Sequence, residues 1–167
     1  MKKYIAILTL LCFSSAAQQA SLISKIESQM DYALRESSRV ASRNSDKVSP
    51  RTVRHDSLIL VASKDWCSGF FPGSLWYLYE KTKDVKWEKS ARLWTAAVEK
   101  EQYNKGTHDL GFMMFDSFGN ELRLTKDPNA KKVLIQSAKS LATRFDPKVG
   151  LIKSWNSFKG GFKYPVI

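Results

Sequence analysis

Apolar residues recur at the spacing of an α-helix along most of this chain, and this periodicity limits the possible folds more than any other feature. The clearest stripe consists of Trp87, Ala91, Trp94 and Val98. Steps of three and four residues place such side chains on one face of a helix. Residues 21–42 and 134–145 show similar spacing, and no alternation typical of β-strands runs through the chain. We therefore predict an all-α fold.

Capping and turn residues divide the chain into about five helices. Asp84 is suited to cap a helix over residues 85–98, and Asp127-Pro128 supplies an N-cap acid followed by proline at the first helical position. Another helix begins around Pro72, and a further one covers residues 108–124. Five helices joined by short loops suit a toroid of α-hairpins as well as a simple bundle.

The remaining segments are polar or short. Residues 43–54 are rich in charge, include Pro50, and predict a loop. Residues 146–150 predict a turn that leads into a short extended segment at residues 151–155. Residues 159–161 predict another turn.

The N-terminal residues 1–17 have the pattern of a secretory signal peptide. Lys2 and Lys3 precede an apolar run at residues 5–13, and small residues follow it. This run is too short to span a bilayer, and no other segment is apolar enough to do so. We predict cleavage near Ala17–Gln18 and export of residues 18–167 to the periplasm or the outside of the cell.

The numbers of cysteine and histidine residues argue against a metal site, a cofactor and a disulfide. Once residues 1–17 are removed, Cys67 is the one cysteine left, and no cysteine-centred catalytic motif surrounds it. We predict a buried structural thiol. His55 and His108 are the two histidines, and their separation does not match the spacing of metal ligands. Neither a metal nor a cofactor is expected.

The chain is basic, with 27 Lys and Arg against 16 Asp and Glu, a net charge of +11. Removal of Lys2 and Lys3 with the signal peptide leaves a net charge of +9. A positive field of this kind concentrates polyanions. Nucleic acid, anionic lipid and acidic polysaccharide are the candidate partners, and export favours the polysaccharide over nucleic acid. A basic surface that only keeps the protein soluble is the alternative.

Two segments combine an acid with aromatic residues and glycine. The first covers residues 65–73 and begins with Asp65-Trp66; the second covers residues 107–115 and contains His108-Asp109. Trp66 is a candidate for stacking on a sugar ring, or else a core residue. We interpret Asp65 as a structural acid that braces its loop.

Asp109 is the candidate for chemistry. In a partly apolar cleft, beside a second carboxylate, a carboxyl group holds a proton more readily and can donate it near neutral pH. The structural alternative is that Asp109 caps the helix that follows it. His108 and Asp109 are adjacent and would point apart within a helix, but they converge on one ligand if both precede its first turn.

Together the two segments resemble glycoside hydrolase family 88, the unsaturated glucuronyl hydrolases. The residues that carry the resemblance are Asp65-Trp66, Ser68-Gly69-Phe70, Gly73, Leu75-Trp76 and His108-Asp109-Leu110-Gly111-Phe112. Weaker agreement continues through Ala138, Leu141, Arg144, Phe145, Gly150-Leu151-Ile152 and Trp155. The resemblance runs from about Leu22 to the C-terminus.

The resemblance implies a barrel of six α-hairpins, of which this chain holds the N-terminal part. It implies a substrate that polysaccharide lyases leave behind, with a 4,5-unsaturated uronic acid at the non-reducing end, such as a chondroitin or heparin fragment. A carboxylic acid protonates C4, water adds at C5, and the hemiketal collapses and releases the sugar. By resemblance, Asp109 is one of two functional aspartates, and Trp66 and His108 contact the substrate.

Family members are more than twice as long, and their second functional aspartate would lie just beyond Ile167. We therefore expect residues 18–167 to be a truncated barrel with little or no hydrolase activity. Two alternatives remain: an unsaturated rhamnogalacturonyl hydrolase with the same barrel, and a non-catalytic periplasmic module that binds acidic glycans. A nucleic-acid binder ranks last, because no recognised module for it is present.

Overall fold

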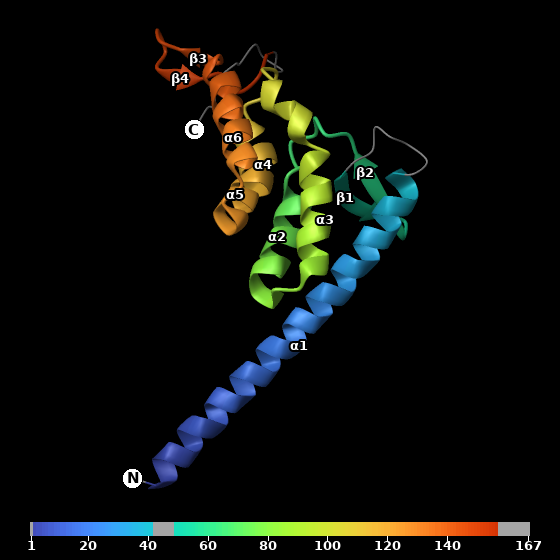
Figure 1. The fold of residues 1–167 in the computed structure, drawn as a ribbon, viewed down its shortest axis with the longest axis vertical. Helices are drawn as coiled ribbons and strands as arrows, with labels where there is room; N and C mark the ends of the chain where they lie inside the picture. The colour runs from blue at the N-terminus through green and yellow to red at the C-terminus, as the bar shows by residue number, and fades with distance from the viewer. Residues whose placement is uncertain (1, 42–48, 157–167) are drawn as a thin grey trace. The chain divides into compact units, whose positions relative to one another are not determined.

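The computed structural model describes residues 2–41 and 49–156, and it divides into two units, residues 1–36 and 37–167 (Figure 1). The first unit consists of the larger part of helix α1 (Lys2–Ala41). This helix covers residues 21–41 of the predicted helix at residues 21–42 and extends toward the N-terminus as far as Lys2. Cleavage near Ala17–Gln18 stays a prediction. In the described ranges, no helix is long and apolar enough to cross a membrane.

The second unit begins its helical part with a hairpin of α2 (Phe70–Thr82) and α3 (Val85–Ala96), which lie side by side (Figure 1). Asp84 caps α3 as predicted, because its side chain accepts a hydrogen bond from the backbone N–H of Lys86. The hairpin is held by apolar burial and by the fully buried Trp76, whose indole N–H donates to Thr95 Oγ1 at 3.0 Å. Helix α2 begins at Phe70, two residues before the predicted start.

The predicted helix at residues 108–124 is a helical segment with an interruption. It consists of α4 (Leu110–Met114), a π-helical turn (Phe115–Gly119) and α5 (Asn120–Thr125). Helix α6 (Pro128–Ala142) then packs against it, and Asp127 caps α6 as predicted. If residues 110–125 count as one segment, the described part of the chain holds the five long helices that the periodicity predicted.

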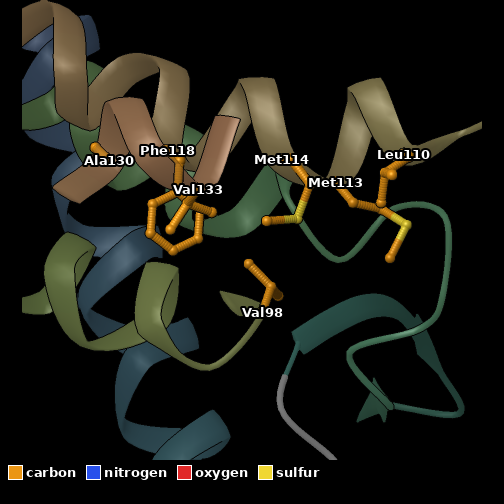
Figure 2. Close-up of a cluster of buried hydrophobic side chains, with 7 residues drawn as sticks. All are labelled: Val98, Leu110, Met113, Met114, Phe118, Ala130 and Val133. Carbon is orange, nitrogen blue, oxygen red and sulfur yellow. The ribbon is translucent and has the colours of Figure 1, made fainter. Parts of the chain in front are cut away.

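One hydrophobic cluster of this unit joins helices that are distant in sequence (Figure 2). Its buried side chains are Val98, Leu110, Met113, Met114, Phe118, Ala130 and Val133. Val98 leads into the short 3₁₀ helix Glu99–Tyr103, and the others come from residues 110–119 and from α6. This packing fixes the start of α4, and therefore fixes the position of residues 107–109 just before it.

Two glycines allow α2 to approach residues 110–119 closely. A Cβ on Gly69 would overlap with the carbonyl oxygens of Phe112 and Met113, and one on Gly73 would lie 2.8 Å from the carbonyl oxygen of Asp116. No larger residue fits at Gly69 without moving backbone. The two acid-containing segments are therefore in direct contact.

Two small antiparallel hairpins are an addition to the predicted all-α pattern. Strand β1 (Ser49–Arg54) pairs with β2 (Ser57–Val61), so the prediction of a loop over residues 43–54 was wrong for its second half. Most of β1 is exposed, and for this reason its sequence lacks an apolar alternation. The register shifts just after Pro50, which can be accommodated at such an irregularity.

The second hairpin pairs β3 (Phe145–Asp146) with β4 (Leu151–Ile152). It confirms the predicted turn at residues 146–150 and the extended start of residues 151–155. The predicted turn at residues 159–161 lies outside the described residues.

Candidate active site

The carboxylate of Asp65 is used for structure. Its Oδ2 accepts a hydrogen bond from Arg51 Nη1 at 2.7 Å, and its Oδ1 accepts from the backbone N–H and the thiol of Cys67 at 3.3 and 3.0 Å. These contacts brace the loop between β2 and α2, as the sequence predicted. Burial, followed by the hydrogen bond to Asp65, raises the pKa of the buried Cys67 thiol to about 11. This agrees with an unreactive structural thiol.

Trp66 lies on the surface, and the alternative that it is a core residue was wrong. Its side chain is 44% exposed and meets Phe70 and Phe112 edge to face, at ring-centroid distances of 5.6 and 6.3 Å. Phe70 and Phe112 are themselves 5.8 Å apart and partly exposed. We call Trp66, Phe70 and Phe112 the aromatic face. It joins the two segments and offers ring surfaces of the kind on which sugars stack.

Asp109 occupies the N-cap position of α4, but its side chain does not cap the helix. Its Oδ2 instead accepts a hydrogen bond from Thr107 Oγ1 at 3.1 Å, and its backbone N–H donates to the same hydroxyl at 3.0 Å. The side chain is 23% exposed. Asp109 therefore lies at the capping position, as the structural alternative expected, but its carboxylate does not cap the helix.

His108 and Asp109 converge, because both precede the first turn of α4. His108 Nε2 lies 3.4 Å from Asp109 Oδ1, and Nδ1 lies 2.8 Å from the carbonyl oxygen of Ser154. A carbonyl oxygen can only accept, so Nδ1 carries a hydrogen and donates it. In the neutral ring, Nε2 then carries no hydrogen, and it lies close to Asp109 Oδ1.

A cavity of about 440 Å³ adjoins His108. It is lined by His108, Gly111, Phe112, Phe115, Asp116 and Leu141. Asp116 is a second carboxyl group at this site, seven residues after Asp109 on the same helical segment, and burial raises its pKa. Sequence reasoning missed Asp116. The spacing of Asp109, Phe112 and Asp116, which is that of one helix face, was the signal that could have found it.

A second cavity of about 370 Å³ lies between α4 and α6 and is mainly apolar. Gly111, Phe115 and Leu141 line both cavities, whereas His108 lines only the first. We therefore place the candidate site at the first cavity. Among the residues whose surroundings the structure describes, no three His, Cys, Asp or Glu side chains gather as metal ligands do.

A buried carboxylate links the two acid-containing segments just before their N-terminal ends. Glu101 is 7% exposed; its Oε1 accepts a hydrogen bond from Ser63 Oγ at 2.5 Å, and its Oε2 accepts from Asn104 Nδ2 at 2.9 Å. Ser63 precedes Asp65-Trp66, and Asn104 precedes residues 107–109. Glu101 thus holds both loops that lead into the site.

Known proteins similar to this chain are hydrolases of unsaturated sugars, although no family model matches it. An unsaturated glucuronyl hydrolase of Formosa agariphila is 44% identical over 108 residues, which are 64% of this chain and 27% of that protein. One of Bacillus sp. strain GL1 is 32% identical over 58% of the chain and 26% of that protein. An unsaturated chondroitin disaccharide hydrolase of Streptococcus agalactiae is 31% identical over 62% of the chain and 26% of that protein.

Solved structures give the same result. An unsaturated glucuronyl hydrolase specific for heparin is similar with a TM-score of 0.66 and 39% identity, over 80% of this chain and 36% of that one. The Bacillus sp. GL1 enzyme is similar with a TM-score of 0.63 and 27% identity, over 77% of this chain and 34% of that one. The comparisons confirm the resemblance and the expected helical-barrel fold class. The chain spans about a quarter of the length of the curated relatives it matches.

Proposed function

We propose that this chain, which is related to the unsaturated glucuronyl hydrolases, supplies the N-terminal part of the active site of a glycoside hydrolase of that kind. The observation that carries the proposal is the environment of the Asp109 carboxylate. Its carboxylate caps no helix and lies 3.4 Å from Nε2 of His108, which lines a cavity of about 440 Å³. This is an acid kept available for a ligand at the place where the resemblance puts a functional aspartate.

The reaction adds water across the C4=C5 double bond of an unsaturated uronic acid. An acid group gives a proton to C4 and the oxygen of water bonds to C5. One of the two protons of that water passes to a base, and the other stays on the new C5 hydroxyl. The resulting hemiketal opens and releases the sugar at C1. Asp109 and His108 lie 3.4 Å apart and both are of residue types that transfer protons, so this pair is suited to orient the substrate and to exchange a proton near the double bond.

The aromatic face and the positive charge suit an acidic sugar. Trp66, Phe70 and Phe112 are partly exposed and lie next to residues 107–109, so a sugar ring can stack on them while its acidic group stays in solvent or meets a cation. The net charge of +11 attracts anionic oligosaccharides over a distance. We infer an acidic substrate of the glycosaminoglycan type, released by polysaccharide lyases.

We infer that the 167-residue chain by itself has little or no hydrolase activity, because it spans only 27% of its Formosa agariphila relative. The test uses a chimera in which the matching residues of this chain replace their counterparts in that relative. The loss of ultraviolet absorbance of unsaturated chondroitin disaccharide reports hydration, since the reaction removes the conjugated double bond. We expect the chimera to hydrate the disaccharide and the 167-residue chain to be inactive. A folded chimera that is inactive on all unsaturated uronic acids would contradict the proposal.

Unsaturated disaccharides from pectin, run in the same assay, distinguish the rhamnogalacturonyl alternative. Faster hydration of the pectin-derived substrate would favour that alternative over the glucuronyl one. Both outcomes keep the chemistry and change only the sugar.

A non-catalytic module that binds acidic glycans is the second candidate, favoured by the basic charge and the exposed aromatic face. It predicts binding of chondroitin oligosaccharides that weakens with salt and does not change in Asp109→Asn. Isothermal titration with both variants decides between this candidate and a site that involves Asp109.

We also propose that residues 1–17 direct export and are removed near Ala17–Gln18. N-terminal sequencing of protein expressed with the whole chain tests this. A mature protein that begins near Gln18 is expected, and an intact Met1 in the exported fraction would contradict it.

A further inference from the structure

Arg144 is a buried cation that binds backbone carbonyls. It is 7% exposed, although arginine is rarely buried. Its Nε donates to the carbonyl oxygen of Lys153 at 2.8 Å, and its Nη1 donates to the carbonyl oxygen of Lys105 at 2.7 Å. Nη1 also donates to Asn156 Oδ1 at 3.1 Å, and Nη2 donates to the carbonyl oxygen of Ser154 at 3.1 Å. None of these four acceptors is a carboxylate.

Burial of a guanidinium lowers the stability of the folded protein, because a buried cation loses its hydration. The planar fork compensates with several hydrogen bonds in fixed directions, which a lysine cannot reproduce. A position of this kind serves to hold separate backbone segments in one arrangement. Here the segments are residues 153–156, which follow β4, and Lys105, which precedes the site residues.

Both segments are connected to His108, the first by contacts and the second along the chain. The carbonyl oxygen of Ser154 accepts from Arg144 Nη2 and also lies 2.8 Å from His108 Nδ1. Trp155, the next residue, places its ring edge to face with that of His108 at 5.7 Å. Lys105 lies three residues before His108 in the chain. Arg144 therefore holds the acceptor that determines which ring nitrogen of His108 carries hydrogen.

We propose that Arg144 is a positioning residue that fixes His108 in the Nδ1–H form and so keeps Nε2, which lies 3.4 Å from Asp109 Oδ1, without a hydrogen. The importance of Arg144 for catalysis rests on the proposed function, whereas its effect on the His108 ring does not depend on that function. Without Arg144, the segment at residues 153–156 loses its link to residue 105. His108 is then free to turn or to place its hydrogen on Nε2, and either change would alter its contact with Asp109.

Nuclear magnetic resonance of the whole 167-residue chain tests this without any need for hydrolase activity. The chain contains two histidines, and His55 lies in the turn between β1 and β2, so it is an internal reference. Long-range ¹H–¹⁵N correlation spectra distinguish the Nδ1–H and Nε2–H forms of a neutral ring. We expect His108 to be in the Nδ1–H form. A wild-type His108 in the Nε2–H form would overturn the proposal.

The variants Arg144→Lys and Arg144→Met test the link itself. Loss of one directing hydrogen bond should reduce the ratio of Nδ1–H to Nε2–H at His108 by roughly five- to tenfold. Arg92→Met is the matched control, because Arg92 also binds several acceptors (Glu88, Glu121 and Asp127) but none that contacts His108. We expect this control and the His55 signals to show no change. An unchanged ratio in a folded Arg144→Met protein would overturn the proposal.

If circular dichroism shows that neither Arg144 variant folds, the wild-type protein still decides. Four hydrogen bonds should slow the rotation of the Arg144 guanidinium, so separate Nη proton signals are expected for it. Averaged Nη signals for Arg144 would contradict the proposal. A negative result in the hydration assay would leave these measurements unaffected, so the failure of one proposal is distinguishable from that of the other.

Discussion

Asp65 and Asp109 look alike in the sequence, since each begins a stretch that contains glycine followed by phenylalanine, yet the protein uses them differently. Asp65 receives hydrogen bonds from Arg51 and from the backbone and thiol of Cys67. Asp109 receives one from Thr107 and faces His108. The comparison teaches that an acid is available for chemistry when part of its carboxylate is not occupied by hydrogen bonds that hold the fold.

The glycines of the two segments differ in the same sense. Gly69 is in contact with backbone on a neighbouring helical segment, where any side chain would collide with carbonyl oxygens. Gly111 has open space where a Cβ would point, and it lines both cavities. The first glycine is required by packing, whereas the second leaves room beside the candidate site.

The largest expected effect comes from exchanging the acids one at a time in the chimera. Asp109→Asn should lower the rate of disaccharide hydration about 10³-fold, because the amide cannot exchange a proton. Asp65→Asn should lower it less than tenfold and act through stability. Initial rates from ultraviolet absorbance measure both. Equal losses in the two variants would remove the distinction between the acids.

The glycine difference predicts opposite effects on stability. Gly69→Ala should lower the free energy of unfolding by about 3 kcal/mol or more, because the methyl group forces backbone apart. Gly111→Ala should raise it by about 0.5 kcal/mol, since alanine is the better helix former and meets no neighbour there. Urea denaturation of the 167-residue chain measures both, and a stable Gly69→Ala protein would show that the two segments are not closely packed.

The burial of Cys67, and after it the hydrogen bond to Asp65, predict a thiol that reacts slowly. With a pKa of about 11, the folded protein should react with iodoacetamide at pH 8 about 100-fold more slowly than the unfolded chain. Peptide mass spectrometry distinguishes Cys67 from Cys12. Because folding raises this pKa, the associated stability is present below the ordinary thiol pKa and is lost as the pH rises toward 11. Fast labelling of folded protein would show that Asp65 does not hold the thiol.

The smallest effect is expected for the ion pair between Arg51 and Asp65. Arg51 has a side chain that is 44% exposed, so water screens the pair. Arg51→Met should therefore cost less than about 1 kcal/mol of stability. Hydration by the chimera should be unchanged, as checked in the same absorbance assay. A strong loss of hydration would instead place Asp65 and its partner in the reaction.

Features that depend on local sequence were predictable from the sequence. The helical stripe of α3 and the caps Asp84 and Asp127 require only neighbouring residues, and they are present as expected. Strand β1 was not predicted, because its exposed side chains leave no apolar alternation and only its pairing with β2 defines it. The π-helical turn at Phe115–Gly119 was also missed, since nothing in the local pattern marks where such a turn interrupts a helix.

The site shows the same division. The segment that holds His108 and Asp109 was found from its sequence, and so was the structural use of Asp65. The exposure of Trp66 was not predictable, because composition does not tell which face of an aromatic segment is covered. Arg144 drew no attention as a site residue, because its partners are mostly backbone carbonyls, which every residue possesses and no motif records.

The π-helical turn at Phe115–Gly119 also has a consequence for changes in chain length. The half of the helix before it supports the site, while the half after it carries Glu121 and Arg123, which pair with Arg92 of α3 and Glu80 of α2. Each residue of an α-helix turns the chain by about 100°. Deletion of one of residues 117–119 would rotate Glu121 and Arg123 away from their partners, even though every residue that lines the candidate site would still be present. The turn therefore sets the rotation of α5, which carries the ion pairs, relative to α4, which supports the site.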